Sequence, residues 1–571
     1  MKKISIAKTD ISEFVCLIPD FATECEKYAA EEFVRYIKSS CGTELEIKKE
    51  SEISTKNIIC IGRCLKTAKA INLTKYGEEG FIITVFDGRL YIAGNEKRGT
   101  LYGVYTFLEN YIGWRFLTED TEILKEGDID LEEGLFEEQF PSMEWRDVCI
   151  PAYLPIDIAV KRKINSSYRR NFPEHMGGSF LYPGRFVHTM ESLLGVPQHQ
   201  QPCFSDEENL KKCIVSVRKL LEENPETRII SVTQNDNNLG EDNFCTCDRC
   251  RKIDEEEGSH AGSLLRFVNA VADAIKDDYP KVSIMTLAYL HTTDCPKITI
   301  PRDNVIIEFA PMTLCYNHGV DDMSCKINSK LLSDFRDWGR ITNRIYIWDY
   351  CANFSFTVPH FPDFQVLRRN VHYYSFHNVC GMFCEGDNYV DNNTTDLSEL
   401  RAYLLSKLLW EPDMSEKDFM RHMDDFLEGY YGKGGRYIKK YLKLLEGAIK
   451  DPDRHIFCYQ NPMMLLSNQY MLDHDDEMFE LWNKAEKASS DNESAAEHLR
   501  RSRLGYTYLR LLYTFDERMK TANEEGKKPL IAENKAFYEA LKHYNIQPRG
   551  WQSKLPEMTD FTQSAGIKIY W

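Results

Sequence analysis

The chain lacks the short motifs that mark several large enzyme classes. It has no G-x-x-x-x-G-K-[ST] phosphate loop, no G-x-G-x-x-G after a predicted strand, no G-x-S-x-G nucleophile turn and no H-E-x-x-H pair. These motifs hold phosphates on backbone amides, expose a serine nucleophile or bind a catalytic zinc ion. Without them, the sequence gives no support to kinases, serine hydrolases or zinc peptidases of the common kinds.

Long apolar runs and an excess of basic residues are also missing. No stretch approaches the roughly 18–20 apolar residues of a membrane-spanning helix, and residues 1–21 have no apolar run or cleavage site typical of a signal peptide. The formal net charge is -18, so we expect neither nucleic acid nor an anionic membrane as a partner. Without an export signal, the 18 cysteines predict reduced thiols and a cytoplasmic location.

The hydropathy pattern divides the chain into three predicted domains. Residues 1–135 combine a helical pattern, buried strands and an Asp87-Gly88 hairpin turn, which predicts a small α/β domain. Residues 136–393 alternate strands with helices, as parallel sheets and barrels do. Residues 394–571 show helical patterns almost throughout and no set of side chains typical of catalysis. We therefore expect a helical C-terminal domain.

The central region predicts a (β/α)8 barrel. Strand patterns lie at residues 143–149, 164–169, 228–233, 282–289, 304–310, 344–348 and 379–383. A weaker eighth pattern lies at residues 180–188, and amphipathic helices fall between several strands. The predicted architecture is therefore a small N-terminal α/β domain, a central (β/α)8 barrel and an all-helical C-terminal domain.

In such barrels the functional side chains lie at the C-terminal ends of the strands. The predicted catalytic residues at these ends are Asp236, Glu385 and Asp349. The predicted substrate-binding residues beside them are Trp348, Tyr289, Glu308 and, from a long insertion at residues 171–202, His188.

Several carboxylates beside aromatic rings suit the hydrolysis of glycosidic bonds. One carboxyl group must be protonated to donate a proton to the leaving oxygen, and a second must be ionised to act as nucleophile, base or electrostatic stabiliser. Crowded acids drive their pKa values apart, which allows both states at one pH. Any one of these acids could instead cap a helix or pair with an arginine, but the set favours catalysis.

A cysteine cluster follows the polar loop that contains Asp236. The pattern C-x-C-x2-C is formed by Cys245, Cys247 and Cys250. Structural zinc takes four ligands, and the candidates for the fourth, Cys203 and His260, stand at no diagnostic spacing. Two interpretations stay open, a structural zinc site and a metal-free knuckle that braces the loop. Catalysis itself is expected to need no cofactor.

Four segments carry a resemblance to a known family. They are GTLYGVYTFLENYIGWRF, SVTQNDNNLGEDNFCTCDRC, GMFCEGDN and LRAYLLSKLLWEPDMS. The chain resembles bacterial glycan-degrading proteins that contain the domain of unknown function 4838, some of which are classed in glycoside hydrolase family 163. The first segment is also similar to the N-terminal domain of family 67 α-glucuronidases and of several hexosaminidases. The resemblance covers most of residues 80–432 and implies the same small domain, barrel and helical tail.

The likeness to family 163 implies cleavage of β-linked N-acetylglucosamine. In the related hexosaminidases the substrate acetamide is the nucleophile, one residue polarises it, and an adjacent acid protonates the leaving group. Asn235 and Asp236 have that adjacency, which makes Asn235 a predicted substrate-binding residue. The polarising residue would then be an asparagine where the hexosaminidases have a carboxylate.

The likeness to α-glucuronidases implies a different mechanism. Its pattern places acids at Asp236, Asp349 and Glu385, with inversion through a water molecule held between acid and base. A uronate substrate would also need a basic clamp, which Arg162 or Arg185 would supply.

We therefore expect a glycoside hydrolase that acts on an oligosaccharide or glycan, with a β-N-acetylglucosaminidase-type reaction and a carboxylate general acid at the barrel rim. An α-glucuronidase-like inverting hydrolase is the alternative within this class. Two alternatives come from other classes. A non-catalytic carbohydrate-binding protein would keep the aromatic residues without needing Asp236 or Glu385. A protein-interaction module stabilised by zinc would contain a degenerate barrel.

Overall fold

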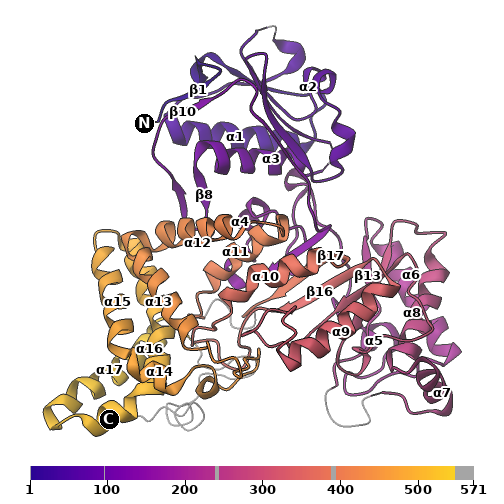
Figure 1. Cartoon of the computed structure of the whole chain (residues 1–571). Helices are drawn as coiled ribbons and strands as arrows, with labels where there is room; N and C mark the ends of the chain where they lie inside the picture. Colours follow the sequence, from indigo (N-terminus) through magenta and orange to yellow (C-terminus); the bar gives the residue numbers. More distant parts are fainter. Residues whose placement is uncertain (1, 54, 96, 238–243, 388–393, 547–571) are drawn as a thin grey trace. The chain divides into compact units, whose positions relative to one another are not determined.

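The chain forms two compact units (Figure 1). The computed structural model describes residues 2–53, 55–95, 97–237, 244–387 and 394–546. The first unit contains Met1–Glu144 and Tyr153–Ser179, and the second contains Trp145–Ala152 and Phe180–Trp571. The chain therefore enters the second unit, returns to the first, and enters the second again.

The first unit is built on a mixed sheet of six strands in the order β11-β6-β7-β5-β3-β4. Its β6–β7 hairpin turns at Asp87 and Gly88, whose φ angles of 53° and 68° are those an Asp-Gly turn adopts. The predicted hairpin is thus confirmed. The strands of this sheet are β3 (Val15–Ile18), β4 (Ile47–Lys49), β5 (Ile58–Ile61), β6 (Phe81–Phe86), β7 (Arg89–Gly94) and β11 (Phe136–Gln139).

Helices α1 and α3 pack against each other in this unit. A capping box between Thr23 and Glu26 begins α1, because each side chain bonds to the backbone N–H of the other residue. Two smaller sheets have the orders β10-β1-β2 and β8-β9. The remaining elements are β1 (Ile4–Ile6), β2 (Thr9–Asp10), β8 (Trp114–Phe116), β9 (Glu122–Leu124), β10 (Ile129–Leu131), α1 (Glu24–Cys41), α2 (Leu65–Ala70), α3 (Gly99–Phe107) and α4 (Ile156–Lys161).

The first unit extends past the boundary predicted at residue 135. Strand β11 pairs antiparallel with β6 and so belongs to this sheet. Residues 153–179 also belong to this unit. The predicted strand at residues 164–169 is wrong, because the segment forms turns and one isolated bridge. Its local apolar pattern is buried in the first unit and does not extend a parallel sheet.

The second unit contains six parallel strands in the order β12-β17-β16-β15-β14-β13. Strands β13 to β17 follow chain order, and β12 returns beside β17, which is the order of a barrel left open between β12 and β13. Within the described residues the predicted segments 164–169 and 180–188 supply no strand to this gap. The sheet therefore forms a partial barrel of β12 (Trp145–Cys149), β13 (Ile229–Ser231), β14 (Ser283–Ala288), β15 (Val305–Phe309), β16 (Ile345–Tyr350) and β17 (Val379–Glu385).

Helices between the strands cover this sheet, as the alternating pattern predicts. Helix α8 packs on β14 and β15, α10 packs on β17, and α6 packs on α8. The helices of this part are α5 (Met190–Leu194), α6 (Glu207–Glu223), α7 (Asp248–Glu257), α8 (Ala261–Ile275), α9 (Lys326–Ile341) and α10 (Phe364–Ser375).

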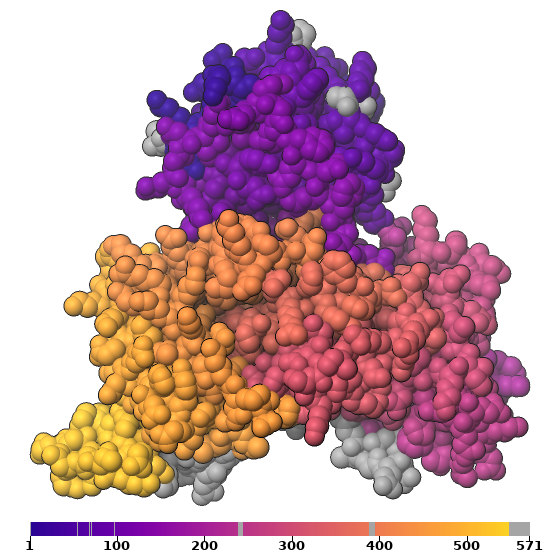
Figure 2. Space-filling view, in the orientation of Figure 1, coloured from indigo at the N-terminus to yellow at the C-terminus, as the bar shows by residue number. Residues whose placement is uncertain are grey.

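The C-terminal helices belong to the same unit as the sheet, where the sequence predicted a separate domain. Helix α11 contacts β12, and its buried Arg401 pairs with Asp363 and Asp396 at 2.9 Å each. In Figure 2 the orange helical surface continues into the salmon surface of the α9–β17 region. The helices are α11 (Ser398–Trp410), α12 (Glu416–Tyr431), α13 (Gly435–Gly447), α14 (Asn468–Asp473), α15 (Asp475–Ala488), α16 (Glu493–Thr521) and α17 (Glu524–His543). Among the described residues, no helix has both the length and the hydropathy needed to span a bilayer.

Candidate active site

One face of the parallel sheet is lined by aromatic rings, and we call it the aromatic face. Side chains alternate between the two faces of a strand, and the face is defined by Trp145, Tyr346, Trp348 and Phe383. The Trp145 and Tyr346 rings stack with centroids 5.3 Å apart, and Trp348 meets Phe383 edge-on at 4.5 Å. These large rings pack together on this face of the sheet, and Glu385 follows them at the end of β17.

Glu385 is the last residue of β17 and lies on the aromatic face. Its register partners on the two neighbouring strands are Cys149 and Tyr350. The indole Nε1 of Trp348 donates a hydrogen bond of 2.8 Å to Glu385 Oε2. An indole N–H is a donor only, so this bond favours the ionised carboxylate. Two predicted site residues, Glu385 and Trp348, are therefore in direct contact.

Asp236 lies in the loop that follows β13 and is half-buried. Tyr289 follows β14, and its hydroxyl donates a hydrogen bond of 3.5 Å to Asp236 Oδ1. The same hydroxyl lies 3.5 Å from the Met312 sulfur. The structure thus joins Asp236 and Tyr289, a second pair of predicted site residues.

Tyr459 is sensitive to the charges of both acids, and the sequence analysis did not predict it. Burial is the largest cause of the raised pKa of Tyr459, and the charges of Cys458, Glu385 and Asp236 add to it in that order. Its side chain stays 46% exposed. Tyr459 comes from the segment between α13 and α14, more than 70 residues after Glu385, and no local pattern marks it.

His188 lies beside the Asp236–Tyr289 pair. Its ring centroid is 6.0 Å from that of Tyr289, and its Nδ1 is 2.9 Å from the carbonyl oxygen of Gln234. Burial lowers the pKa of His188, and the charge of Asp236 acts against that effect. A neutral ring with its hydrogen on Nδ1 satisfies the carbonyl. The backbone φ of 56° at His188 is a left-handed conformation that costs free energy for residues other than glycine.

The side-chain amide of Asn235 is bonded to the loop that precedes Gln201. Its side-chain nitrogen donates to the carbonyl oxygens of Val196, Pro197 and Gln200 at 2.9–3.1 Å. Its side-chain oxygen accepts from Gln198 at 3.2 Å. Both ends of the amide are therefore used to hold residues 196–200 against the strand end. Asn235 positions the loop around Asp236.

Asp349 lies on the other face of the sheet, away from Glu385. It pairs in register with Cys384, and the next residue along each strand forms the Tyr350–Glu385 pair. Neighbouring residues of a strand point to opposite faces of the sheet. Its carboxylate accepts from Tyr316 at 3.2 Å, the Tyr350 backbone N–H at 3.0 Å and the Cys351 thiol at 3.5 Å. Burial raises the pKa of Asp349 to about 6. The structure does not bring this predicted catalytic residue together with Glu385.

Glu308 lies on the aromatic face but below the rim. It pairs in register with Tyr346, four residues before the Tyr350 position that faces Glu385. The side chain is 0% exposed, and within the described residues neither carboxyl oxygen has a hydrogen-bond partner. Burial raises the pKa of Glu308 to about 8, so the group is protonated at neutral pH. It is an interior group and not the predicted rim contact.

Arg162 belongs to the first unit. Its guanidinium lies 2.5 Å from the Glu109 carboxylate, and the two side chains are 1% and 4% exposed. A buried ion pair of this kind leaves little of the charge for a ligand. The second basic candidate, Arg185, is in the second unit and pairs with Glu191 at 3.2 Å.

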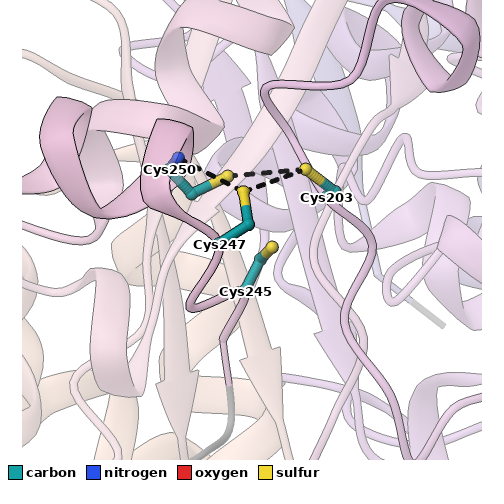
Figure 3. Close-up of side chains that lie close together, drawn as sticks. All are labelled: Cys203, Cys245, Cys247 and Cys250. Carbon is teal, nitrogen blue, oxygen red and sulfur yellow. Dashed lines mark hydrogen bonds between the residues drawn. The ribbon is translucent and has the colours of Figure 1, made fainter.

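The predicted cysteine cluster gains Cys203 as its fourth member (Figure 3). The Cys203 sulfur lies 3.6 Å from that of Cys247 and 3.7 Å from that of Cys250. Sulfur atoms around a tetrahedral zinc ion are about 3.7 Å apart, so the set fits zinc. Cys247 caps α7, and the backbone N–H of Cys250 lowers the pKa of the Cys247 thiol to about 6.

Three solved structures share low similarity with the chain. A GH138 enzyme targeting pectin rhamnogalacturonan II aligns at 11% identity and a TM-score of 0.47, over 93% of this chain and 74% of the other. CpGH84B aligns at 10% identity and 0.47, over 93% of each chain. The Flavobacterium johnsoniae chitobiase aligns at 12% identity and 0.42, over 95% of this chain and 97% of the other.

Comparison with protein families gives two matches. The family described as glycosyl hydrolase family 67 N-terminus matches residues 10–107, within the first unit. The family described as domain of unknown function DUF4838 matches residues 146–443, which include every predicted site residue. No curated protein matches the sequence. Because residues 146–443 are more than half of the chain, the protein belongs to the DUF4838 family.

Proposed function

We propose that the protein is a glycoside hydrolase in which Asp236 and Glu385 are the two catalytic carboxyl groups. The observation that carries the proposal is that each acid follows or ends a strand of the same parallel sheet and accepts a hydrogen bond from an aromatic side chain, Tyr289 for Asp236 and Trp348 for Glu385. Two acids among aromatic rings at the open end of a partial barrel suit a bound sugar.

The two carboxyl groups take different roles. Glu385 accepts the Trp348 N–H and is the ionised group that faces the developing positive charge at the anomeric carbon. Asp236 is half-buried in the polar loop that follows β13 and is the proton donor to the leaving oxygen. Its neighbour His188 is largely neutral, because burial lowers the pKa of that ring.

A β-linked N-acetylglucosaminide is the first substrate class to test. With both ends of its amide bonded to the loop at residues 196–200, Asn235 does not polarise the substrate acetamide. A substrate-assisted reaction would therefore need another side chain to polarise the acetamide. Tyr289 is the candidate, because its hydroxyl donates a hydrogen bond to the proposed acid, Asp236. An α-glucuronide is the second class, for which a basic group other than the buried Arg162 would have to bind the uronate.

The test is hydrolysis of a panel of aryl glycosides and natural glycans, with β-N-acetylglucosaminides and α-glucuronides as its main arms. The wild-type chain should release the aglycone from at least one arm. The Glu385→Gln variant should lose most of that turnover on every substrate, and the Asp236→Asn variant should lose most of its turnover on natural glycans. Retained turnover in both variants would reject the site, and a folded wild-type protein that binds glycans without cleaving any would favour the carbohydrate-binding alternative.

We further propose that Cys203, Cys245, Cys247 and Cys250 hold a structural zinc ion that braces the loop after β13. The four sulfur atoms lie within 4.8 Å of one another, and four protein ligands leave no open position for catalysis. Zinc analysis of wild type and of the Cys203→Ser/Cys247→Ser variant tests this site. The variant should hold one zinc ion fewer, and equal zinc contents would reject the proposal.

A further inference from the structure

A second group of thiols and imidazoles lies in the second unit, at residues the sequence motifs did not mark. Its members are Cys315, His318, Cys325 and His455, and one ligand atom from each lies within 4.8 Å of all the others. They come from three separate segments. Cys315 and His318 follow β15, Cys325 is the residue before α9, and His455 lies between α13 and α14.

The distances within this group match a tetrahedral metal site. Cys315 Sγ lies 3.3 Å from His318 Nδ1 and 3.4 Å from His455 Nδ1, and Cys325 Sγ lies 3.7 Å from His455 Nδ1. With zinc–sulfur bonds of about 2.3 Å and zinc–nitrogen bonds of about 2.0–2.1 Å, ligand atoms of a tetrahedral site lie about 3.3–3.8 Å apart. Both histidines present the same nitrogen, Nδ1, to the group.

Asn328 holds two of these residues in place. Its side-chain oxygen accepts from the Cys315 backbone N–H at 2.8 Å, and its side-chain nitrogen donates to the carbonyl oxygens of Cys315, His318 and Gly319 at 3.0–3.1 Å. The asparagine is 0% exposed. A fully bonded buried amide fixes the C-x2-H turn, as residues around metal ligands commonly do.

We propose that Cys315, His318, Cys325 and His455 bind a second structural zinc ion. Two thiolates and two neutral imidazoles bring a charge of about -2, which Zn²⁺ neutralises, and a neutral unit is the least costly way to bury such groups. Cys315 and Cys325 are 0% and 2% exposed and neither forms a disulfide. Four protein ligands fill the coordination sphere, so the site is structural.

The second zinc ion would fix the segment that presents Tyr459. His455 precedes Tyr459 by four residues, and the intervening backbone is bonded to the barrel loops. Tyr316 N–H donates to the Ile456 carbonyl at 2.8 Å, and Phe354 N–H donates to the Cys458 carbonyl at 2.7 Å. By coordinating residues from both, the metal would also connect this segment to the loop after β15. This consequence for Tyr459 rests on the proposed hydrolase function, whereas the metal site does not.

Metal content tests the site without reference to activity. Wild-type protein purified from cells grown with zinc should hold two zinc ions per chain, one for each cluster. His318→Ala and His455→Ala should each hold one fewer, and the Cys203→Ser/Cys247→Ser variant should retain the second ion. His199→Ala and Cys295→Ser are matched controls that should leave the count unchanged. Zinc contents unaffected by either His318→Ala or His455→Ala would overturn the proposal.

The ligand set gives a second measurement that needs no variant of the site. X-ray absorption at the zinc edge should report an average of about three sulfur and one nitrogen neighbours per zinc in wild type, since one site is S4 and the other S2N2. In the Cys203→Ser/Cys247→Ser variant the average should become two and two. An all-sulfur environment in wild type would overturn the second site.

Hydrolysis of the panel substrate by the metal-depleted His455→Ala variant tests the link to Tyr459. We expect a loss of about 10–100-fold relative to wild type, the range for residues that support a site indirectly. If wild type cleaves no glycoside, the proposed function fails while the zinc counts still decide the metal site. Full activity in a variant that has lost one zinc ion would remove the link to Tyr459.

Discussion

Asp236 and Glu385 differ from Glu308 and Asp349 in their neighbours, although all four are acids near the ends of parallel strands. The charges of the first two both help to raise the pKa of the half-exposed Tyr459. Glu308 is enclosed on the aromatic face without a hydrogen-bond partner among the described residues. Asp349 also accepts a hydrogen bond from a tyrosine, Tyr316, but it lies on the opposite face of the sheet.

The difference teaches that a strand-end position is not sufficient for a role in catalysis. Two further quantities decide it. One is the face of the strand, which changes with every residue, so Asp349 and Glu385 point to opposite sides. The other is the register depth, which sets Glu308 four residues below the rim. Changes at the four acids should therefore divide into losses of rate and changes of stability.

The largest expected effect is at Glu385. Glu385→Gln keeps the size of the side chain but removes the charge that would stabilise the transition state, so turnover should fall by about 10²–10⁴-fold. Steady-state kinetics on the best panel substrate measure this loss. Glu226→Gln, at an exposed site in the same unit, is the matched control and should keep wild-type turnover. A loss of less than about tenfold at Glu385 would place the ionised group elsewhere.

Asp236→Asn should have an effect of similar size that depends on the leaving group. A proton donor matters for a natural alcohol leaving group and much less for an acidic phenol, which leaves without protonation. We expect a loss of about 10²–10⁴-fold for a natural glycan and a far smaller loss for a nitrophenyl glycoside. Equal losses for both substrates would show that Asp236 is not the proton donor.

A smaller effect is expected at Tyr459. Tyr459→Phe removes only the hydroxyl whose pKa both carboxylates help to raise, and a charge interaction at a half-exposed side chain is worth about 1 kcal/mol. Turnover should therefore fall by about fivefold, without loss of stability, because the ring remains. Tyr437→Phe, at a half-buried tyrosine of α13, is the control. Unchanged turnover in Tyr459→Phe would show that Tyr459 has no part in the site of Asp236 and Glu385.

Glu308→Gln should leave turnover unchanged and alter the pH dependence of stability. The pKa of Glu308 is raised from 4.5 to about 8 in the folded protein. The folded chain therefore binds a proton that the unfolded chain has released, and wild type loses stability as pH rises from about 4.5 to 8.

Glu308→Gln removes this loss, so the difference in melting temperature, variant minus wild type, should increase between pH 5 and pH 8. Thermal denaturation at several pH values measures it. Asp349→Asn should show the same sign over a narrower window, up to a pH of about 6. A large loss of turnover in either variant would contradict the division between rim acids and buried acids.

Some features were predictable because they depend on neighbours in the chain. The hairpin at Asp87-Gly88 follows from its turn residues, and the strands β12 to β17 follow from short buried runs between amphipathic helices. The contact of Glu385 with Trp348 and that of Asp236 with Tyr289 were within reach, because parallel strands bring their C-terminal ends to one edge. The hydrogen bonds of Asn235 to residues 196–200 were not predictable, because these residues lie in an insertion without a regular pattern.

The sequence by itself determined the alternation of strands and helices, the family, and the strand ends at which acids would collect, because these depend on local periodicity and short motifs. Only the tertiary structure decided which acids meet, that the barrel has a gap between β12 and β13, and that Cys203 joins the other three cysteines. It also brought Tyr459 and His455 to the sheet from the helical region. The physical reason is that face, register depth and long-range packing depend on side chains far apart in the chain.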